Sequence, residues 1–163
     1  MSTAAKDITS DDRAWRSGRA DPADCAAPES ARGQQAPSLD AWLREAKCDP
    51  AAAGCGMFLF HNGVVRETAR ASVREGKQDA AAVVGMRFSY DREKVEAARE
   101  AALRMPGIAY ARVWLNSGTL AVGDDIMLVL VGGDIRPHVI DALQALVGEI
   151  KTRCVVEQEL CAD

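Results

Sequence analysis

The sequence predicts one α+β domain, in which strand runs and separate helices share a single core. The apolar content of 48% in 163 residues is enough for an ordinary buried core. Segments with helical and strand periods follow one another in the order α-β-β-α-β-β-α. That order lacks the regular strand–helix alternation of a doubly wound fold, so it favours α+β.

Residues 1–37 differ from the rest of the chain and are predicted to form a flexible, disordered N-terminal arm. They are rich in Ala, Asp, Ser, Arg, Gln and Pro, with Trp15 as their one aromatic residue. So few large apolar groups cannot offset the entropy lost on ordering. A short partner-binding segment around Trp15 is the alternative. The folded domain is therefore expected to span residues 38–163.

A helix is expected at the start of this domain, capped by Ser38 or Asp40. The Asp49-Pro50 pair ends it, because proline cannot continue the hydrogen-bond ladder of a helix. The apolar residues between these limits recur at helical spacing, at Leu39, Trp42, Leu43 and Ala46.

Residues 57–60 (MFLF) are predicted to form a buried strand that reaches the Asn62-Gly63 pair. Asn-Gly favours a tight turn, but apolar strand residues resume directly after it, so a β-bulge is the alternative. Residues 67–80 are polar and charged without large apolar clusters, and a mobile loop is expected there.

The next strand and helix are predicted from a change of period at Asp91. Before it, every second residue is apolar, which is typical of a half-buried strand, at Val84, Met86, Phe88 and Tyr90. Asp91 then caps a helix that Pro106-Gly107 ends. The apolar side of this helix consists of Val95, Ala98, Ala102 and Met105.

Two further strands and a long helix complete the predicted domain. Residues 108–115 form one strand, and the apolar run at 126–131 (IMLVLV) is expected to be a central strand. Asp134 is the expected cap of the last helix, and Pro137 suits its first turn. A continuous apolar stripe runs along this helix, at Val139, Ile140, Leu143, Leu146, Val147 and Ile150.

The overall charge and hydropathy exclude several classes of protein. The net charge of −4 and the sequence pI of about 5.3 disfavour nucleic-acid binding, which usually requires a basic face or stripe. No apolar run approaches the roughly 18 residues of a membrane span. The polar N-terminus lacks the apolar core of a secretory signal, so a cytoplasmic protein is expected.

The cysteines and histidines predict no metal site. The five cysteines are odd in number and irregularly spaced, and no two form a CxxC pair. The two histidines, His61 and His138, lie far apart in sequence. A zinc site needs convergent pairs of ligands, so the cysteines are interpreted as thiols in a reducing compartment.

Several short motifs, taken in order, resemble the molybdopterin synthase catalytic (large) subunit family (MoaE-like). The resemblance covers most of the chain and depends on the order and spacing of the motifs, since a single GxLxxGD would be weak. The motifs are the first helix with Asp49-Pro50, the strand leading to residues 63–66 (GVVR), residues 118–124 (GTLAVGD), Asp134-Ile135-Arg136 and Ile150-Lys151.

The resemblance implies sulfur transfer in molybdenum cofactor biosynthesis, on a hammerhead-like α/β fold. In this family a small ubiquitin-like sulfur-carrier subunit inserts its C-terminal Gly-Gly tail, activated as a thiocarboxylate, into a pocket of the large subunit. Two sulfurs pass in turn to cyclic pyranopterin monophosphate, a pterin phosphate, and form the dithiolene of molybdopterin. The step needs no metal. The family assembles as a homodimer of large subunits with one small subunit at each end, a heterotetramer.

The implied pocket binds two anions, so it should be cationic although the whole chain is acidic. An arginine fork binds phosphate at two points, and a lysine shielded from water donates a proton or stabilises developing negative charge. The resemblance assigns substrate binding to Arg66, with its neighbours Val64 and Val65, and to Arg136. It assigns catalysis to Lys151.

The spacing of these residues leads to a hypothesis about assembly. Arg136 stands where Gly132-Gly133 leads into a helix N-terminus, whose free N–H groups favour a phosphate. Lys151 lies 15 residues further along the chain, which is roughly 22 Å at 1.5 Å per residue. A small substrate cannot readily touch both within one chain. The hypothesis is therefore a site shared across a homodimer interface.

The chain also departs from the family pattern. Ile135 replaces the histidine of a His-Arg pair, and Gln158 stands at or near the place of a second lysine. Leu115-Asn116 replaces another His-Arg pair upstream. His61 is an auxiliary candidate, as a proton carrier, and its alternative is a surface or packing histidine.

Three functions remain open. The first is an active sulfurtransferase that uses Lys151, Arg66 and Arg136. The second is a binding or regulatory relative that keeps the fold and the dimer but has lost the chemistry. The third is an unrelated α+β domain that binds a pterin phosphate or nucleotide phosphate at the Gly132-Gly133 helix start.

Overall fold

Two three-stranded antiparallel sheets form the framework of the protein, whose computed structural model describes residues 34–75 and 81–162. The first sheet has the strand order β1-β5-β3, and the second has the order β4-β2-β6. The strands are β1 (Met57–Val64), β2 (Val83–Tyr90), β3 (Ile108–Leu115), β4 (Gly118–Ala121), β5 (Asp125–Gly133) and β6 (Val155–Cys161).

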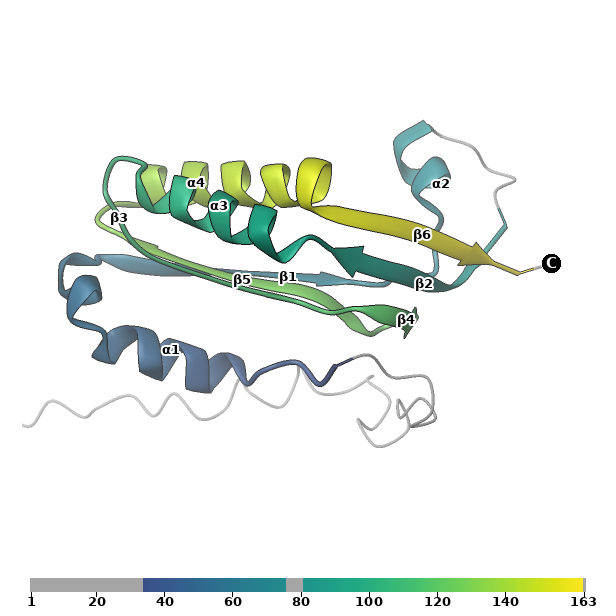
Figure 1. The fold of residues 1–163 in the computed structure, drawn as a ribbon, viewed down its shortest axis with the longest axis horizontal. Helices are drawn as coiled ribbons and strands as arrows, with labels where there is room; N and C mark the ends of the chain where they lie inside the picture. The colour runs from purple at the N-terminus through teal and green to yellow at the C-terminus, as the bar shows by residue number, and fades with distance from the viewer. Residues whose placement is uncertain (1–33, 76–80, 163) are drawn as a thin grey trace, which may run out of the picture.

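Helices cover both faces of the first sheet. α3 and α4 lie side by side on one face, and α1 lies on the other (Figure 1). The helices are α1 (Leu39–Cys48), α2 (Arg70–Glu75), α3 (Arg92–Leu103) and α4 (Arg136–Glu149), with a 3-10 turn, η3 (Pro50–Gly54), and a π-helical turn, η4 (Ile150–Cys154). This arrangement confirms the predicted α+β class. Within the described ranges, no helix has the length and apolar character needed to cross a membrane.

β5 is the central strand of the first sheet, as its apolar sequence predicts, and its residues 126–133 are buried. Successive side chains of a strand face opposite sides, so β5 contributes buried side chains to a hydrophobic cluster on each face of the sheet. On one face, Leu128 and Leu130 pack against Trp42 of α1. On the other face, β5 joins the larger core with α3 and α4 through Met127, Val129 and Val131.

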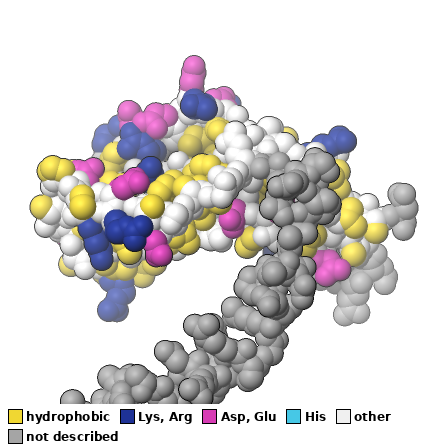
Figure 2. Space-filling model, turned by 90° about the horizontal axis from the view of Figure 1, so that it is seen from below, with side chains coloured by type: hydrophobic (Ala, Val, Ile, Leu, Met, Phe, Trp, Pro, Cys, Tyr) yellow, Lys and Arg dark blue, Asp and Glu magenta, His cyan; other side chains and the backbone are white. Residues whose placement is uncertain are grey.

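α1 begins and ends where the sequence predicts. The Ser38 hydroxyl accepts a hydrogen bond from the first turn of the helix at 3.3 Å, and Asp49 with Pro50 stops the helix. Trp42 is buried against the sheet, and the guanidinium of Arg112 lies 4.5 Å from the centre of its ring. On this side of the molecule, charged side chains of both signs lie among hydrophobic ones, so the described residues form no basic stripe here (Figure 2).

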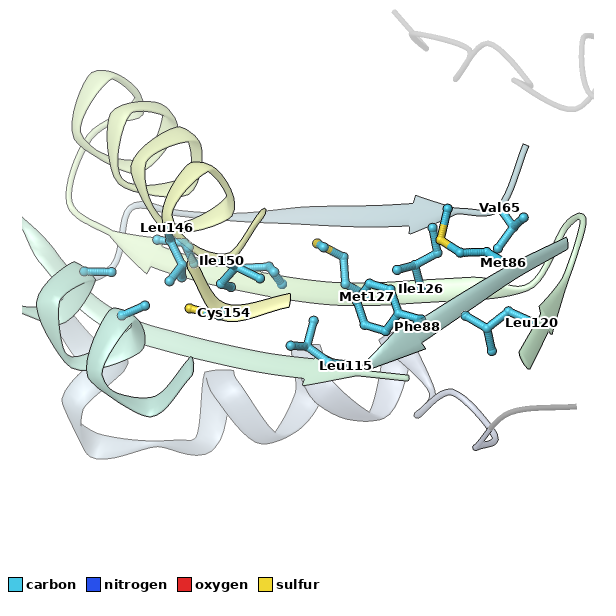
Figure 3. Close-up of a cluster of buried hydrophobic side chains, with 14 of the residues drawn as sticks. Val65, Met86, Phe88, Leu115, Leu120, Ile126, Met127, Leu146, Ile150 and Cys154 are labelled. Atoms are coloured by element: carbon cyan, nitrogen blue, oxygen red, sulfur yellow. The ribbon is translucent and has the colours of Figure 1, made fainter. Parts of the chain in front are cut away.

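The second sheet extends the larger core beyond the helices (Figure 3). Met86 and Phe88 of β2 pack with Leu120 of β4, and Met127 of β5 joins them. The two sheets therefore share one continuous core, and the pocket described below lies where they meet.

The alternation in β2 holds from Met86 onward but fails at its first residues. Val84, predicted to face the core, is 57% exposed, whereas Val83 is 2% exposed. The pairing of β2 with β6 shifts register between Val83 and Gly85. Such a bulge moves the following residues to the opposite face, which explains the error at Val84.

Three further features correct the sequence prediction. α2 occupies part of the expected loop at 67–80, of which residues 76–80 lie outside the described ranges. β6 follows the last helix, where no strand is predicted, and both elements depend on contacts between distant segments. Ile135, not Asp134, is the N-cap of α4. The Asp134 carboxylate instead accepts from the Ile135 N–H at 2.6 Å and lies 2.8 Å from Nδ1 of His138.

The predicted arm, residues 1–37, falls largely outside the described residues. Its last part contacts the domain. The Gln34 N–H donates to Oδ1 of Asn116 at 2.8 Å, and Ala36 packs beside Trp42. From residue 34 onward, the chain therefore lies against the domain.

Candidate functional site

A small pocket, with a volume of about 140 Å³, lies where the ends of β1 and α4 meet α2 and β6. Val64, Arg66 and Lys151, three of the residues predicted for the site, line it. The other lining residues are Arg70, Val73, Met86, Ile126, Glu157 and Glu159. Three cationic side chains and two carboxylates thus share one pocket, which makes it the candidate functional site.

The predicted residues at the end of β1 alternate between the core and the pocket. The pairing of β1 with β5 shifts register between Gly63 and Val64, where Ile126 of β5 is the unpaired residue. The strand therefore continues past Asn62-Gly63 without a tight turn, and the irregularity lies in β5 and not in β1. Val65 is 2% exposed, and its backbone N–H donates to the Asp124 carbonyl at 3.0 Å. Arg66 is exposed, and its Nε donates to the Thr68 carbonyl at 2.9 Å. Val65 therefore anchors the segment in the core, while Val64 and Arg66 line the pocket.

Lys151 reaches the pocket from the π-helical turn η4, which joins α4 to β6. Its neighbours Ile150 and Cys154 are 0% and 3% exposed, whereas Lys151 itself is exposed. Single π-helical turns occur frequently at functional sites, because the wider turn re-aims the side chains that follow it. Two core residues thus hold the turn while it presents Lys151 to solvent and to the pocket.

His61 of β1 lies near Lys151, although it does not line the pocket. Its Nε2 is buried without a hydrogen-bond partner among the described residues. Burial lowers the pKa of His61 below its ordinary value, and the positive charge of Lys151 lowers it further. The imidazole is therefore expected to be neutral at neutral pH, and it is electrostatically coupled to Lys151.

Replacing Lys151 with methionine is expected to raise the pKa of His61 toward its ordinary value. The substitution removes the nearby positive charge, whereas burial still keeps the pKa somewhat low. Titration of the imidazole resonances by NMR measures the change. Arg153→Met, in the same turn, is the control, because Arg153 is exposed and pairs with Glu149. Equal His61 pKa values in Lys151→Met and the parent protein would contradict the coupling.

The same pKa shift has a consequence for stability. The pKa of His61 is lower in the folded chain than in the unfolded chain, so the unfolded state binds the proton more readily. The stability contribution is therefore present above the ordinary value of 6.5 and decreases as the pH falls below it.

Arg136 is not brought to this pocket within one chain. It opens α4, whose 14 residues separate it from Lys151 by about 20 Å at 1.5 Å per residue. The glycines that precede it have a packing role. An added Cβ at Gly133 would lie 2.5 Å from a backbone carbonyl oxygen, and one at Gly132 would lie 2.5 Å from the ring of Phe58. Close packing at the end of β5 therefore accounts for Gly132-Gly133 without a phosphate.

Three charged residues of the pocket, Arg70, Glu157 and Glu159, are not predicted from the sequence. Nη2 of Arg70 donates to Glu157, and the Glu159 carboxylate accepts from the Arg70 backbone N–H at 3.0 and 3.1 Å. Gln158, near the place expected for a second lysine, is exposed and pairs with Arg87 of β2. The spacing of Glu157 and Glu159 is the sequence feature that could have revealed them, because residues two apart in a strand lie on the same face.

Asn116, at the place of the upstream His-Arg pair, has a structural role. It is 3% exposed. Its Nδ2 donates to the Asp125 carbonyl at 2.8 Å, and its Oδ1 accepts from the backbone N–H groups of Gln34 and Ser117 at 2.8 and 2.9 Å. Buried polar groups need such partners, so Asn116 fastens the start of the described chain to β5.

A larger groove, of about 560 Å³, lies between α3 and the end of α4. Alanines form much of its lining, and its two cations are already paired: Lys94 with Asp91 at 3.3 Å, and Arg153 with Glu149 at 3.5 Å. It holds none of the predicted site residues. In residues 34–75 and 81–162, no three His, Cys, Asp or Glu side chains converge to hold a metal ion.

Comparisons with known proteins point to one family. The family model described as MoaE protein matches residues 34–153. Molybdopterin synthase from Staphylococcus aureus is 16% identical with a TM-score of 0.60, and the match covers 78% of this chain and 88% of that chain. The molybdopterin biosynthesis MoaE protein from Burkholderia ambifaria MC40-6 is 17% identical with a TM-score of 0.57, covering 77% and 80%.

A third solved structure is a complex of subunits 1 and 2 of molybdopterin-converting factor from Helicobacter pylori 26695. It is 19% identical with a TM-score of 0.54, and the match covers 76% of this chain and 75% of that chain. At these identities the structural matches show the fold alone. A search of the curated proteins gave no match.

Proposed function

The chain belongs to the MoaE protein family, and we propose that it acts in molybdenum cofactor biosynthesis as the catalytic (large) subunit of a molybdopterin synthase. The observation that carries the proposal is the convergence of Arg66 and Lys151, from distant parts of the chain, on one pocket. One protein of the same fold is a molybdopterin synthase, and another is a complex of molybdopterin-converting factor subunits, which supports this assignment.

The proposed reaction moves sulfur from the thiocarboxylated C-terminus of a small ubiquitin-like subunit to cyclic pyranopterin monophosphate. Both reactants are anions, so the cations of the pocket attract them. Arg66 holds a phosphate or thiocarboxylate with its planar fork, and Val64 packs beside the ligand. Lys151 donates a proton or stabilises the negative charge that develops during transfer. The proposed chemistry requires no metal or other cofactor.

Arg136 enters this proposal through a second copy of the chain. It lies at the opposite end of α4 from Lys151, and it does not line the pocket. In a symmetric homodimer, each interface residue of one copy meets the other copy, so one α4 end can complete the partner's pocket. We therefore propose a homodimer in which Arg136 of one protomer serves the Lys151 pocket of the other.

A reconstituted assay tests the function directly. The full chain, a thiocarboxylated small subunit and cyclic pyranopterin monophosphate are expected to yield molybdopterin. The same small subunit with an ordinary C-terminal carboxylate is the control, because it carries no sulfur to transfer. A chain that binds neither the small subunit nor the pterin phosphate would remove the proposal.

The second candidate is a binding or regulatory member of the family without the chemistry. The observation in its favour is the composition of β6, which turns Glu157 and Glu159 into the pocket and Gln158 away from it. Carboxylates oppose the binding of anions. The reconstituted assay separates the two candidates, because a stable complex that forms no molybdopterin supports the binding module.

A further inference from the structure

Two carboxylates of β6 fix Arg70 in the wall of the pocket. The Glu159 carboxylate accepts from its backbone N–H at 3.0 and 3.1 Å, and Glu157 accepts from Nη2 of its guanidinium. Both contacts join residues that are 87 or 89 positions apart in the sequence. The tertiary structure, and not the local sequence of α2, therefore determines where this guanidinium lies.

The two partners of the ion pair differ in exposure. The Glu157 side chain is 9% exposed, and its Oε1 has no hydrogen-bond partner among the described residues. A buried carboxylate without a cation is strongly unfavourable, so Glu157 holds Arg70 firmly. The Arg70 side chain is 41% exposed. Within the described residues, its guanidinium makes one hydrogen bond, from Nη2 to Glu157. A guanidinium has five N–H donors, so its other edge is available to a ligand.

The charges of the pocket show what Arg70 contributes. Arg66, Arg70 and Lys151 face Glu157 and Glu159, which leaves one net positive charge. Without Arg70, two cations would face two carboxylates, and the pocket would not attract an anion by its net charge. The cation expected from a second lysine near Gln158 is absent, because that side chain is a neutral amide on the opposite face of β6.

We propose that Arg70 supplies this missing cation and donates to the terminal oxyanion of the ligand, while Glu157 and Glu159 position it. The inference rests on the proposed function, which gives the pocket an anionic ligand. The oxyanion belongs either to the phosphate of the small substrate or to the C-terminal carboxylate of the partner subunit. Arg70 contacts the ligand with the edge of its guanidinium that Glu157 leaves open.

Calorimetric titration of the full chain tests the role of Arg70, with inorganic pyrophosphate and a short peptide ending in Gly-Gly as separate probes. Arg70→Ala is expected to weaken the binding of at least one probe about tenfold, the effect of losing a hydrogen bond to a charged group. The probe that responds identifies the source of the oxyanion. Arg70→Lys should recover part of the loss, because it keeps the charge but not the fork. Arg104→Ala, which removes the exposed arginine at the C-cap of α3, is the matched control.

Glu157 variants test the positioning role, because charge and position predict opposite results. Glu157→Ala removes a negative charge, so electrostatics alone predicts tighter binding of an anion. If Glu157 positions Arg70, Glu157→Ala instead weakens binding about threefold or more, which is about half or more of the Arg70 effect in free energy. Glu157→Gln keeps an acceptor for Nη2 and is expected to bind at least as tightly as the parent. Circular dichroism establishes that each variant is folded.

The outcomes separate this inference from the proposed function. If Arg66→Ala and Lys151→Ala weaken binding but Arg70→Ala does not, Arg70 has no ligand role and the pocket still stands. If Glu157→Ala binds more tightly than the parent, the positioning role is wrong. If the parent chain binds neither probe, or no pocket variant differs from Arg104→Ala, both the inference and the pocket fail. Molybdopterin formation by the parent chain then tests the proposed function independently of these binding results.

Discussion

Replacing Lys151 with alanine is expected to lower the rate of molybdopterin formation by about 10²- to 10³-fold, the range observed when a proton donor or a charge-stabilising group is removed. Lys151 is the pocket's one ammonium among the described residues, and η4 holds it between the buried Ile150 and Cys154. Arg153→Ala, in the same turn, is the matched control and should keep near-normal activity, because Arg153 faces Glu149 outside this pocket. The rate is measured in the reconstituted assay with saturating small subunit.

The hypothesis of a site shared between protomers makes a further prediction for Lys151→Ala. Mixing Lys151→Ala chains with Arg136→Ala chains creates heterodimers, in which one pocket has both native residues and the other has neither. Random mixing of equal amounts should therefore restore about a quarter of the parent activity, as the two-fold symmetry of the dimer requires. Activity no higher than that of either mutant homodimer would exclude a site that combines Arg136 and Lys151 across protomers.

The predicted elements that the structure confirms share strong local signals. β5 is apolar over residues 126–131 because both of its faces are covered, and a buried strand fits a run of that length better than a helix does. α1 carries a hydroxyl cap at Ser38 and a proline stop at Pro50. Asp91 caps α3 through hydrogen bonds to the N–H groups of Glu93 and Lys94. In each case the residues that determine the element lie within it or next to it.

The features that the sequence does not predict depend on contacts between distant segments. α2 has only six residues, and its first N–H is satisfied by Glu159, which is 89 positions away. β6 pairs with β2, and its sequence (VVEQELC) has no alternation of apolar and polar residues that would identify a strand. The bulge at Val83 reverses the faces of β2 for the same reason, because register is a property of the pair and not of one strand.

The residues of the candidate site fall into the same two groups, those with a local sequence signal and those that depend on contacts between distant segments. Arg66, Val64 and Lys151 were accessible through the resemblance, since they stand within ordered motifs, and the structure places them together. Arg70 and Glu157 have no motif of their own, and only the folded chain brings them into contact. The charge balance of the pocket therefore could not be calculated from the sequence, although it determines whether an anion binds there.

Ile150 connects the packing of the core with the position of Lys151. Its side chain is fully buried in the larger core, at the point where α4 becomes the π-helical turn (Figure 3). Ile150→Ala removes three carbons from a site that the rigid sheet below cannot easily fill. The free energy of unfolding is expected to fall by about 2–5 kcal/mol, against about 0.5–1.5 kcal/mol for Ile150→Val. Urea denaturation monitored by circular dichroism measures both values.

Ile140→Ala is the matched control, because it removes the same side chain from α4, the preceding helix, at a position that is 43% exposed. Its cost should stay below about 1 kcal/mol, since partly exposed groups lose less on truncation. In folded Ile150→Ala, the loosened turn should also let Lys151 move away from His61, so the pKa of His61 should rise. A large loss of stability with an unchanged His61 pKa would mean that the core holds α4 without positioning Lys151. A higher His61 pKa in both Ile150→Ala and Lys151→Met would instead show that the burial of Ile150 positions the charge of Lys151 near His61.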